Sequence, residues 1–237
     1  MGLRSPPRSP YSRYIYFVIV SFQTGIINPV YLVPLMDLIG VASDVDGSYP
    51  TPMQVFFTTE KEIGLFLSRL AGLCCPVCGA TGTLVRHGYI RWKKGRKENS
   101  VRAWRVHCKG NTRRQGCGHA PSVRLGNTLP RRYFNADELW AFIRELLDAR
   151  SIKNAWEAIT LRKGFPTSLS NTYKLVRRLT LCQTVLRTQL NIRGPPPKMK
   201  AGVPLLHVLA HVKEVFGGSS PIATYQLSFQ RDFLAVT

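Results

Sequence analysis

The stretch Cys75-Pro76-Val77-Cys78-Gly79 begins a region that holds four of the six cysteines in the chain. Two thiolates separated by two residues, with a glycine that lets backbone N–H groups turn towards sulfur, are typical of half of a tetrahedral metal site. The second half is predicted at Cys108 and Cys117, because Gly118 follows Cys117 as Gly79 follows Cys78. Eight residues separate this second pair, so six residues beyond the usual two must bulge outwards as a loop.

Four thiolates leave no open coordination position, so the pattern predicts one structural zinc ion and no catalytic metal. His107 and His119 flank the second pair, and either could replace a cysteine. Reduced cysteines without a metal are the remaining alternative. Cys74 and Cys182 are expected to be thiols outside the site. Clustered cysteines in a chain without a convincing secretory signal predict a reducing, cytoplasmic location.

The charge of the chain is strongly positive and unevenly distributed. Its 33 Lys and Arg against 13 Asp and Glu give +20, and residues 74–133 hold fourteen of these basic residues against the single acid Glu98. Such a local excess repels itself unless a polyanion or counterions neutralise it. A solvated surface is the alternative, but nucleic acid is favoured because each basic residue could release a phosphate counterion.

The predicted nucleic-acid contacts lie in two groups. Around a predicted hairpin with strands at 83–92 and 100–108, basic residues interleave with Tyr89 and Trp104, two aromatic residues that are expected in the core of the ribbon. The full set of predicted contacts is Arg86, Arg91, Lys93, Lys94, Arg96, Lys97, Arg102, Arg105, Arg113, Arg114, Arg131, Arg132, Asn171, Lys174, Arg177 and Arg178.

Apolar spacing predicts helices on both sides of this hairpin. One helix is expected over 60–72, and three more are expected to begin at the caps Asn135, Ser151 and Ser168. The order of the last three is that of a helix-turn-helix, whose third helix would present Ser170, Asn171, Thr172, Lys174, Arg177 and Arg178 to DNA. Any three-helix bundle with a basic face would look similar. After the run Gly194-Pro195-Pro196-Pro197, one final helix is expected near 203–216.

The predicted fold class is therefore α+β, with a small β zinc ribbon followed by an α-helical, helix-turn-helix-like domain. The boundaries are an extension at 1–53, a short helix at 54–73, the ribbon at 74–133, the helical domain at 134–193, and a Pro-rich linker with a helix at 194–237. Within the extension, residues 14–42 are long and apolar, but Gln23, Asn28, Pro29, Pro34 and Asp37 interrupt a clean membrane helix. Translation could also begin at Met53.

Residues 74–190 resemble the N-terminal zinc-ribbon region of bacterial insertion-sequence transposases. The matching elements occur in order and are CPVCG, Arg86-His87-Gly88, Gly118, Ser122, Pro130 and Arg131-Arg132-Tyr133. We call each pair of cysteines, with the glycine that follows it, a knuckle. The second knuckle is longer than in that pattern, and Ala120-Pro121 stands where an aromatic residue is usual. The resemblance implies binding of transposon ends or related DNA. It also implies a downstream ribonuclease-H-like domain with three carboxylates, but after residue 190 only Glu214 and Asp232 are acidic.

The leading hypothesis is a non-catalytic DNA-binding protein, with no small-molecule substrate and no membrane partner. A truncated relic, or a subunit acting with a separate catalytic transposase chain, is one alternative. An active nuclease that uses Glu214 or Asp232, and a regulator tethered to a membrane through residues 14–36, are the others.

Overall fold

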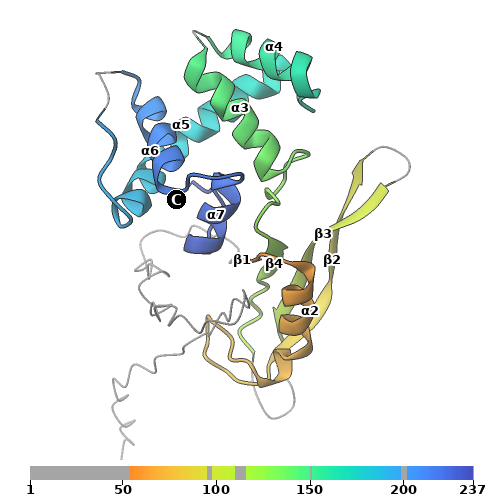
Figure 1. Cartoon of the computed structure of the whole chain (residues 1–237). Coiled ribbons are helices and arrows are strands. Elements are labelled where there is room, and N and C mark those ends of the chain that lie inside the picture. Colours follow the sequence, from red (N-terminus) through yellow and green to blue (C-terminus); the bar gives the residue numbers. More distant parts are fainter. Residues whose placement is uncertain (1–53, 95–97, 110–115, 150, 199–201, 237) are drawn as a thin grey trace, which may run out of the picture. The chain divides into compact units, whose positions relative to one another are not determined.

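A pair of long antiparallel strands forms one side of the sheet in the computed structural model, which describes residues 54–94, 98–109, 116–149, 151–198 and 202–236. Strand β2 (Leu84–Lys94) pairs with β3 (Glu98–Cys108), so the predicted hairpin is confirmed. Figure 1 shows these two strands as the longest in the described chain. The predicted extension at 1–53, with its apolar stretch, lies outside the described residues.

Two short strands that the sequence did not predict complete a mixed four-stranded sheet of order β1-β4-β3-β2. Strand β4 (Ser122–Leu125) runs antiparallel to β3, and β1 (Gln54–Phe57) runs parallel to β4. The sheet therefore extends beyond the predicted ribbon and includes a strand from the segment that was expected to form only a short helix.

Two irregularities in the pairing of β2 with β3 change where side chains point. The register places Arg86 opposite Val106 and Gly88 opposite Arg105, which leaves His87 as an extra residue on β2. Gly88 has a φ of +132°, a backbone conformation that L side chains rarely adopt. A second shift leaves Arg102 as an extra residue on β3. Bulges of this kind re-aim individual side chains without ending the strand.

Helix α2 (Glu60–Ser68) packs its apolar side against the sheet. Thr59 and Glu62 form a capping box at its start, and Ile63 is buried with Val106 and Val123 in one core cluster. The predicted helix at 60–72 is shorter in the structure, because it ends at Ser68 and is followed by the 3-10 turn η1 (Leu70–Gly72). The Ser68 hydroxyl donates to the Leu65 carbonyl at 2.9 Å, a local bond that competes with helix continuation.

Three helices follow the sheet, and each begins at the cap that the sequence predicts. Helices α3 (Ala136–Asp148), α4 (Ile152–Lys163) and α5 (Leu169–Asn191) are capped by the side chains of Asn135, Ser151 and Ser168. The turn between α4 and α5 places Phe165 in the core, where its ring stacks on Phe142 with centroids 5.4 Å apart. The indole of Trp156 donates to the Thr167 carbonyl at 2.9 Å and fastens the same turn.

The C-terminal segment holds two helices, α6 (Pro204–Val215) and α7 (Pro221–Phe229), where the sequence predicted one. Helix α7 is joined to the sheet by two glutamines. Gln230 accepts from Phe56 N–H at 2.7 Å and donates to the Phe56 carbonyl at 3.1 Å, which covers backbone groups of the edge strand β1. Gln226 is fully buried and donates to the carbonyl of Gly126 at 2.6 Å and to that of Thr128 at 3.1 Å. The described residues, which all lie between 54 and 236, belong to one compact unit.

We predict that Gln226→Leu destabilises the fold by at least about 2 kcal/mol, because each buried polar group left without a partner costs about 1–3 kcal/mol. Urea unfolding monitored by circular dichroism measures the change. Gln183→Leu is the matched control, since the Gln183 side-chain oxygen is buried without a hydrogen-bond partner. Equal effects of the two substitutions would contradict a special role for Gln226.

Candidate metal centre and basic surface

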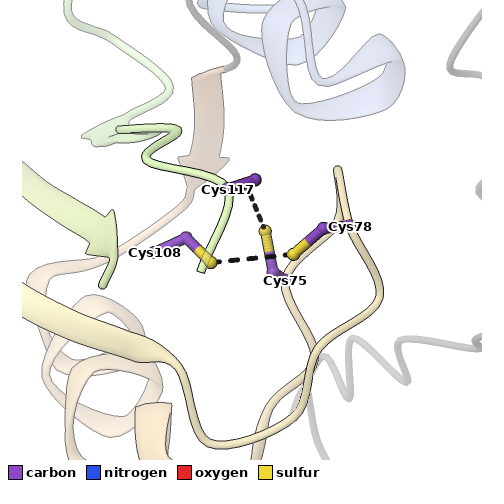
Figure 2. A group of neighbouring side chains, drawn as sticks. All are labelled: Cys75, Cys78, Cys108 and Cys117. Atoms are coloured by element: carbon purple, nitrogen blue, oxygen red, sulfur yellow. Dashed lines mark hydrogen bonds between the residues drawn. The ribbon is translucent and has the colours of Figure 1, made fainter. Parts of the chain in front are cut away.

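The side chains of four cysteines meet where β3 ends. Cys75 and Cys78 follow η1, Cys108 is the last residue of β3, and Cys117 precedes β4. Figure 2 shows the sulfurs of Cys75, Cys78 and Cys108 lying close together beside Cys117. All four sulfur atoms lie within 4.8 Å of one another, and none of the four cysteines is in a disulfide.

The sulfur separations match the dimensions of a tetrahedral metal site. The Cys75 and Cys117 sulfurs are 3.6 Å apart, and those of Cys78 and Cys108 are 3.7 Å apart. A Zn–S distance of about 2.3 Å gives a regular tetrahedron with edges of about 3.8 Å. A disulfide would instead need about 2.05 Å between the sulfurs. The donor set and its spacing therefore fit a metal ion held by four thiolates.

The two halves of the centre share one pattern of backbone hydrogen bonds. In the first half, Gly79 N–H donates to the Cys75 carbonyl at 2.8 Å and Cys75 N–H donates to the Ala80 carbonyl at 2.9 Å. In the second half, Gly118 N–H donates to the Cys108 carbonyl at 3.1 Å and Cys108 N–H donates to the His119 carbonyl at 2.9 Å.

The glycines have nearly equal φ values, +70° at Gly79 and +74° at Gly118. The six extra residues of the second half therefore do not change the backbone hydrogen bonds and the glycine conformation that close the knuckle. They are accommodated between Cys108 and Cys117, within a stretch whose residues 110–115 lie outside the described part of the chain.

Burial and backbone hydrogen bonds shift the pKa values of these cysteines in different directions. Burial raises the pKa of Cys75 to about 12, although backbone N–H groups of Cys78 and Val77 act against it. The Ala80 N–H lowers the pKa of Cys78 to about 7. Burial also raises the pKa of Cys117, partly offset by the His119 N–H. A bound cation would stabilise all four thiolates at once, which backbone N–H groups alone do not achieve.

Neither neighbouring histidine joins the cluster of ligand atoms. The His107 ring lies against that of His87, with centroids 5.4 Å apart. His119 holds the second knuckle through its backbone, and its buried Nε2 has no hydrogen-bond partner. Among the described residues, the four cysteines form the one group of three or more possible metal ligands. Outside it, Cys74 bonds the Thr81 hydroxyl at 3.1 Å and Cys182 is buried in α5.

The hairpin exposes an aromatic ring between two arginines. The guanidinium of Arg86 lies 4.6 Å from the centroid of the Tyr89 ring, and that of Arg91 lies 5.8 Å from it. The expectation that Tyr89 belongs to the core is wrong, because its side chain is 44% exposed. Trp104, on the neighbouring strand, does pack against the core cluster. The pairing places Tyr89 opposite Trp104.

A second group of arginines, which we call the arginine cluster, lies around Arg124 and Asp232. Its members are Arg102, Arg105, Arg124, Arg131, Arg132 and Arg178. The charges of Arg102, Arg105 and Arg131 act on Arg124, and those of Arg124, Arg132 and Arg178 act on Asp232. Arg124 is only 7% exposed and its Nε has no hydrogen-bond partner. Burial lowers the pKa of Arg124, Asp232 raises it, and the charges of three further arginines lower it again. Positive charge is therefore concentrated at this point of the chain.

Asp232 is half-buried, and the charges of three members of the arginine cluster act on it. Burial raises the pKa of its carboxyl group, while the Leu234 N–H and the charges of Arg124, Arg178 and Arg132 lower it. Arg124 is not among the nucleic-acid contacts that the sequence predicts. Its strand pattern, apolar at Val123 and Leu125, was a signal that could have placed it in a sheet.

The predicted contacts on α5 fall into two classes. Asn171, Lys174 and Arg177 are exposed, as a role in binding requires. The expectation for Thr172 is wrong, since it is fully buried and its hydroxyl donates to the Ser168 carbonyl at 3.0 Å. Arg178 donates from Nε to the Leu234 carbonyl at 2.8 Å and so ties α5 to the C-terminal segment.

The remaining predicted contacts lie on the hairpin and in the segment that leaves the sheet. Arg105 and Arg131 are exposed, whereas Arg102 and Arg132 are half-buried. The guanidinium of Arg102 donates to the Tyr133 carbonyl at 3.3 Å. Lys93 and Lys94 lie in β2, and four others lie outside the described residues: Arg96, Lys97, Arg113 and Arg114.

The chain matches no protein-family model, and neither a curated protein nor a solved structure shows significant similarity to it. None of the helices in the described part of the chain combines the length and apolarity needed to cross a membrane. An account of function therefore has to be built from the four-cysteine centre and the basic surface.

We predict one zinc ion per chain in the purified protein, and its loss in Cys117→Ser, because three thiolates and a hydroxyl bind zinc far more weakly than four thiolates. Elemental analysis after dialysis measures the stoichiometry. Cys74→Ser is the matched control, since the Cys74 sulfur bonds Thr81 and lies outside the cluster. Full zinc retention by Cys117→Ser would contradict a four-cysteine site.

Zinc affinity is also expected to fall as the pH is lowered. Burial places the pKa of Cys75 at about 12 and raises that of Cys117, so in the metal-free protein both are protonated near neutral pH. Binding then displaces at least two protons, and each contributes about a tenfold loss of affinity per pH unit. Chelator competition between pH 6 and 8 measures the slope, and a flat profile would contradict thiolate ligation.

Proposed function

We propose that this protein is a non-catalytic DNA-binding protein in which the four-cysteine centre holds one structural zinc ion. The observation that carries the proposal is the arginine cluster, in which the charges of six arginines act on Arg124 or on the half-buried carboxylate of Asp232. Concentrated like charge is costly unless a polyanion neutralises it, and the phosphate backbone of a nucleic acid is such a polyanion.

The proposed zinc ion stabilises the strand that presents part of this basic surface. Strand β3 ends at Cys108 and also contains Arg102 and Arg105, so a metal at its end holds the strand that presents these arginines. Zinc would supply no open coordination position, and its contribution is to the stability of the fold. The side chains that meet the nucleic acid are those of the chain itself.

Two further surfaces support DNA as the partner. The exposed Tyr89 ring with its flanking arginines offers stacking together with phosphate contact. Helices α4 and α5 and the turn between them have the order of a helix-turn-helix, and in this reading α5 is the recognition helix. Asn171 near its start suits the edges of bases, and Lys174 and Arg177 suit phosphates.

The proposal includes ancestry shared with the DNA-binding region of insertion-sequence transposases. Strand cleavage, where it occurs, would belong to a separate chain. The surroundings of Asp232 support this assignment, since the positive charges of Arg124, Arg132 and Arg178 act on its carboxylate and oppose the approach of a divalent cation. Glu214, the other acid of this segment, is exposed on α6.

We predict that the full chain binds duplex DNA with an affinity that falls steeply with salt, and that Arg105→Gln combined with Arg131→Gln lowers the salt slope by about 2. Fluorescence anisotropy with a labelled duplex at several salt concentrations measures both quantities. Arg187→Gln is the control, because Arg187 is exposed on α5 well beyond the proposed contacts.

Three results would contradict the proposal. Binding that does not depend on salt would show that the protein makes no phosphate contacts. An unchanged salt slope in the double variant would show that the arginine cluster does not contact the DNA. Stronger binding to a duplex RNA of the same sequence would replace DNA by RNA as the partner.

A further inference from the structure

Thr83 is a buried polar residue that lies between the two halves of the four-cysteine centre. Its side chain is 1% exposed, and its hydroxyl oxygen lies 3.1 Å from the Cys108 sulfur and 3.1 Å from the Ala80 carbonyl oxygen. Its own carbonyl accepts from Lys109 N–H at 2.8 Å. Thr83 therefore contacts one knuckle through Ala80 and the other through Cys108.

Three of the four sulfurs receive a hydrogen bond from the backbone N–H two residues further along the chain. The donors are Val77 for Cys75, Ala80 for Cys78 and His119 for Cys117. For Cys108 this position belongs to the inserted residues, and the N–H of the next residue, Lys109, is already given to the Thr83 carbonyl. Among the described residues, the Thr83 hydroxyl lies at hydrogen-bond distance from the Cys108 sulfur, 3.1 Å away, and either atom could be the donor.

We infer that Thr83 is a positioning residue of the metal centre, whose hydroxyl donates to the Cys108 thiolate. This inference rests on the proposed metal centre. It gives each of the four ligand sulfurs a hydrogen-bond donor from the described part of the chain.

The Thr83 hydroxyl has one proton and two possible acceptors, the Ala80 carbonyl and the Cys108 sulfur. Which of them it donates to depends on whether Cys108 is a thiol or a thiolate. When Cys108 is a thiol, its S–H can donate to the Thr83 oxygen while the hydroxyl donates to the Ala80 carbonyl. When a metal binds, the thiol proton leaves to solvent and the sulfur can only accept. The hydroxyl then turns to sulfur, and the Ala80 carbonyl keeps the bond from Cys75 N–H at 2.9 Å. The rotation leaves no buried group unpaired.

We expect Thr83→Val, which keeps the shape but removes the hydroxyl, to weaken zinc binding by about 10–100-fold, the range typical of lost outer-shell partners. In the Co²⁺-loaded protein the thiolate-to-metal charge-transfer band should move to lower energy, because a sulfur without its hydrogen bond is more electron-rich. Thr83→Ser should restore the affinity and the band. A packing defect alone would not move this band.

Thr81→Val is the matched control, because the Thr81 hydroxyl bonds Cys74, a cysteine outside the cluster. It should bind zinc and cobalt as the unaltered chain does. An unchanged affinity and spectrum in Thr83→Val would overturn the inference while the metal centre stands. Failure of the unaltered chain to bind Zn²⁺ or Co²⁺ would instead overturn the metal centre itself.

A measurement on the unaltered chain covers the case in which Thr83→Val does not fold. In the ¹¹³Cd-loaded protein, hydrogen bonds to the ligand sulfurs are expected to give scalar couplings between cadmium and the donated protons. The Thr83 hydroxyl proton should show such a coupling alongside the N–H protons of Ala80 and His119. Couplings to the N–H protons without one to the hydroxyl would overturn the inference.

Discussion

The approach of four sulfur atoms to within 4.8 Å is the interaction on which the sheet end of this protein depends. Cys75 and Cys108 are buried and Cys78 and Cys117 are exposed, and thiolates at this spacing repel one another. Desolvation raises the pKa of Cys75 and Cys117, so ionising these two thiols without a cation costs free energy. Zinc, as proposed, would convert this cost into stability, because it replaces protons and joins the segment after η1 to the end of β3 and the segment before β4. The hydrogen bonds at Gly79 and Gly118 show that both halves are already folded to receive it.

The basic surface follows from the same construction. Strand β3 links the metal end of the sheet to Arg102 and Arg105, and the bulge at Arg102 turns its guanidinium to the Tyr133 carbonyl. The C-terminal segment completes this arrangement, since Asp232 enters the arginine cluster and Gln230 covers the edge of β1. The C-terminal segment, which is distant in sequence, therefore interacts both with the arginine cluster and with the edge strand β1.

Several elements could be predicted because their signals are local. The caps Asn135, Ser151 and Ser168 begin helices where the side-chain chemistry requires it, and the period-two pattern of β2 and β3 identified the hairpin. The strands β1 and β4 were missed because four residues carry too little periodicity, and their pairing joins residues far apart in the chain. Helix α7 was missed because it is apolar on most of its surface, as a short buried helix is.

The sequence by itself determined the identity and spacing of the four cysteines, the excess of arginine and the helix caps, since these depend on residue type and on neighbours along the chain. Only the tertiary structure decided that the long second knuckle closes as the short one does, and that Thr83 lies at Cys108. It also decided that Tyr89 is exposed, and that the buried Arg124 interacts electrostatically with the half-buried Asp232. The physical reason is that burial and long-range pairing depend on which segments meet in space, and residue order along the chain does not specify this.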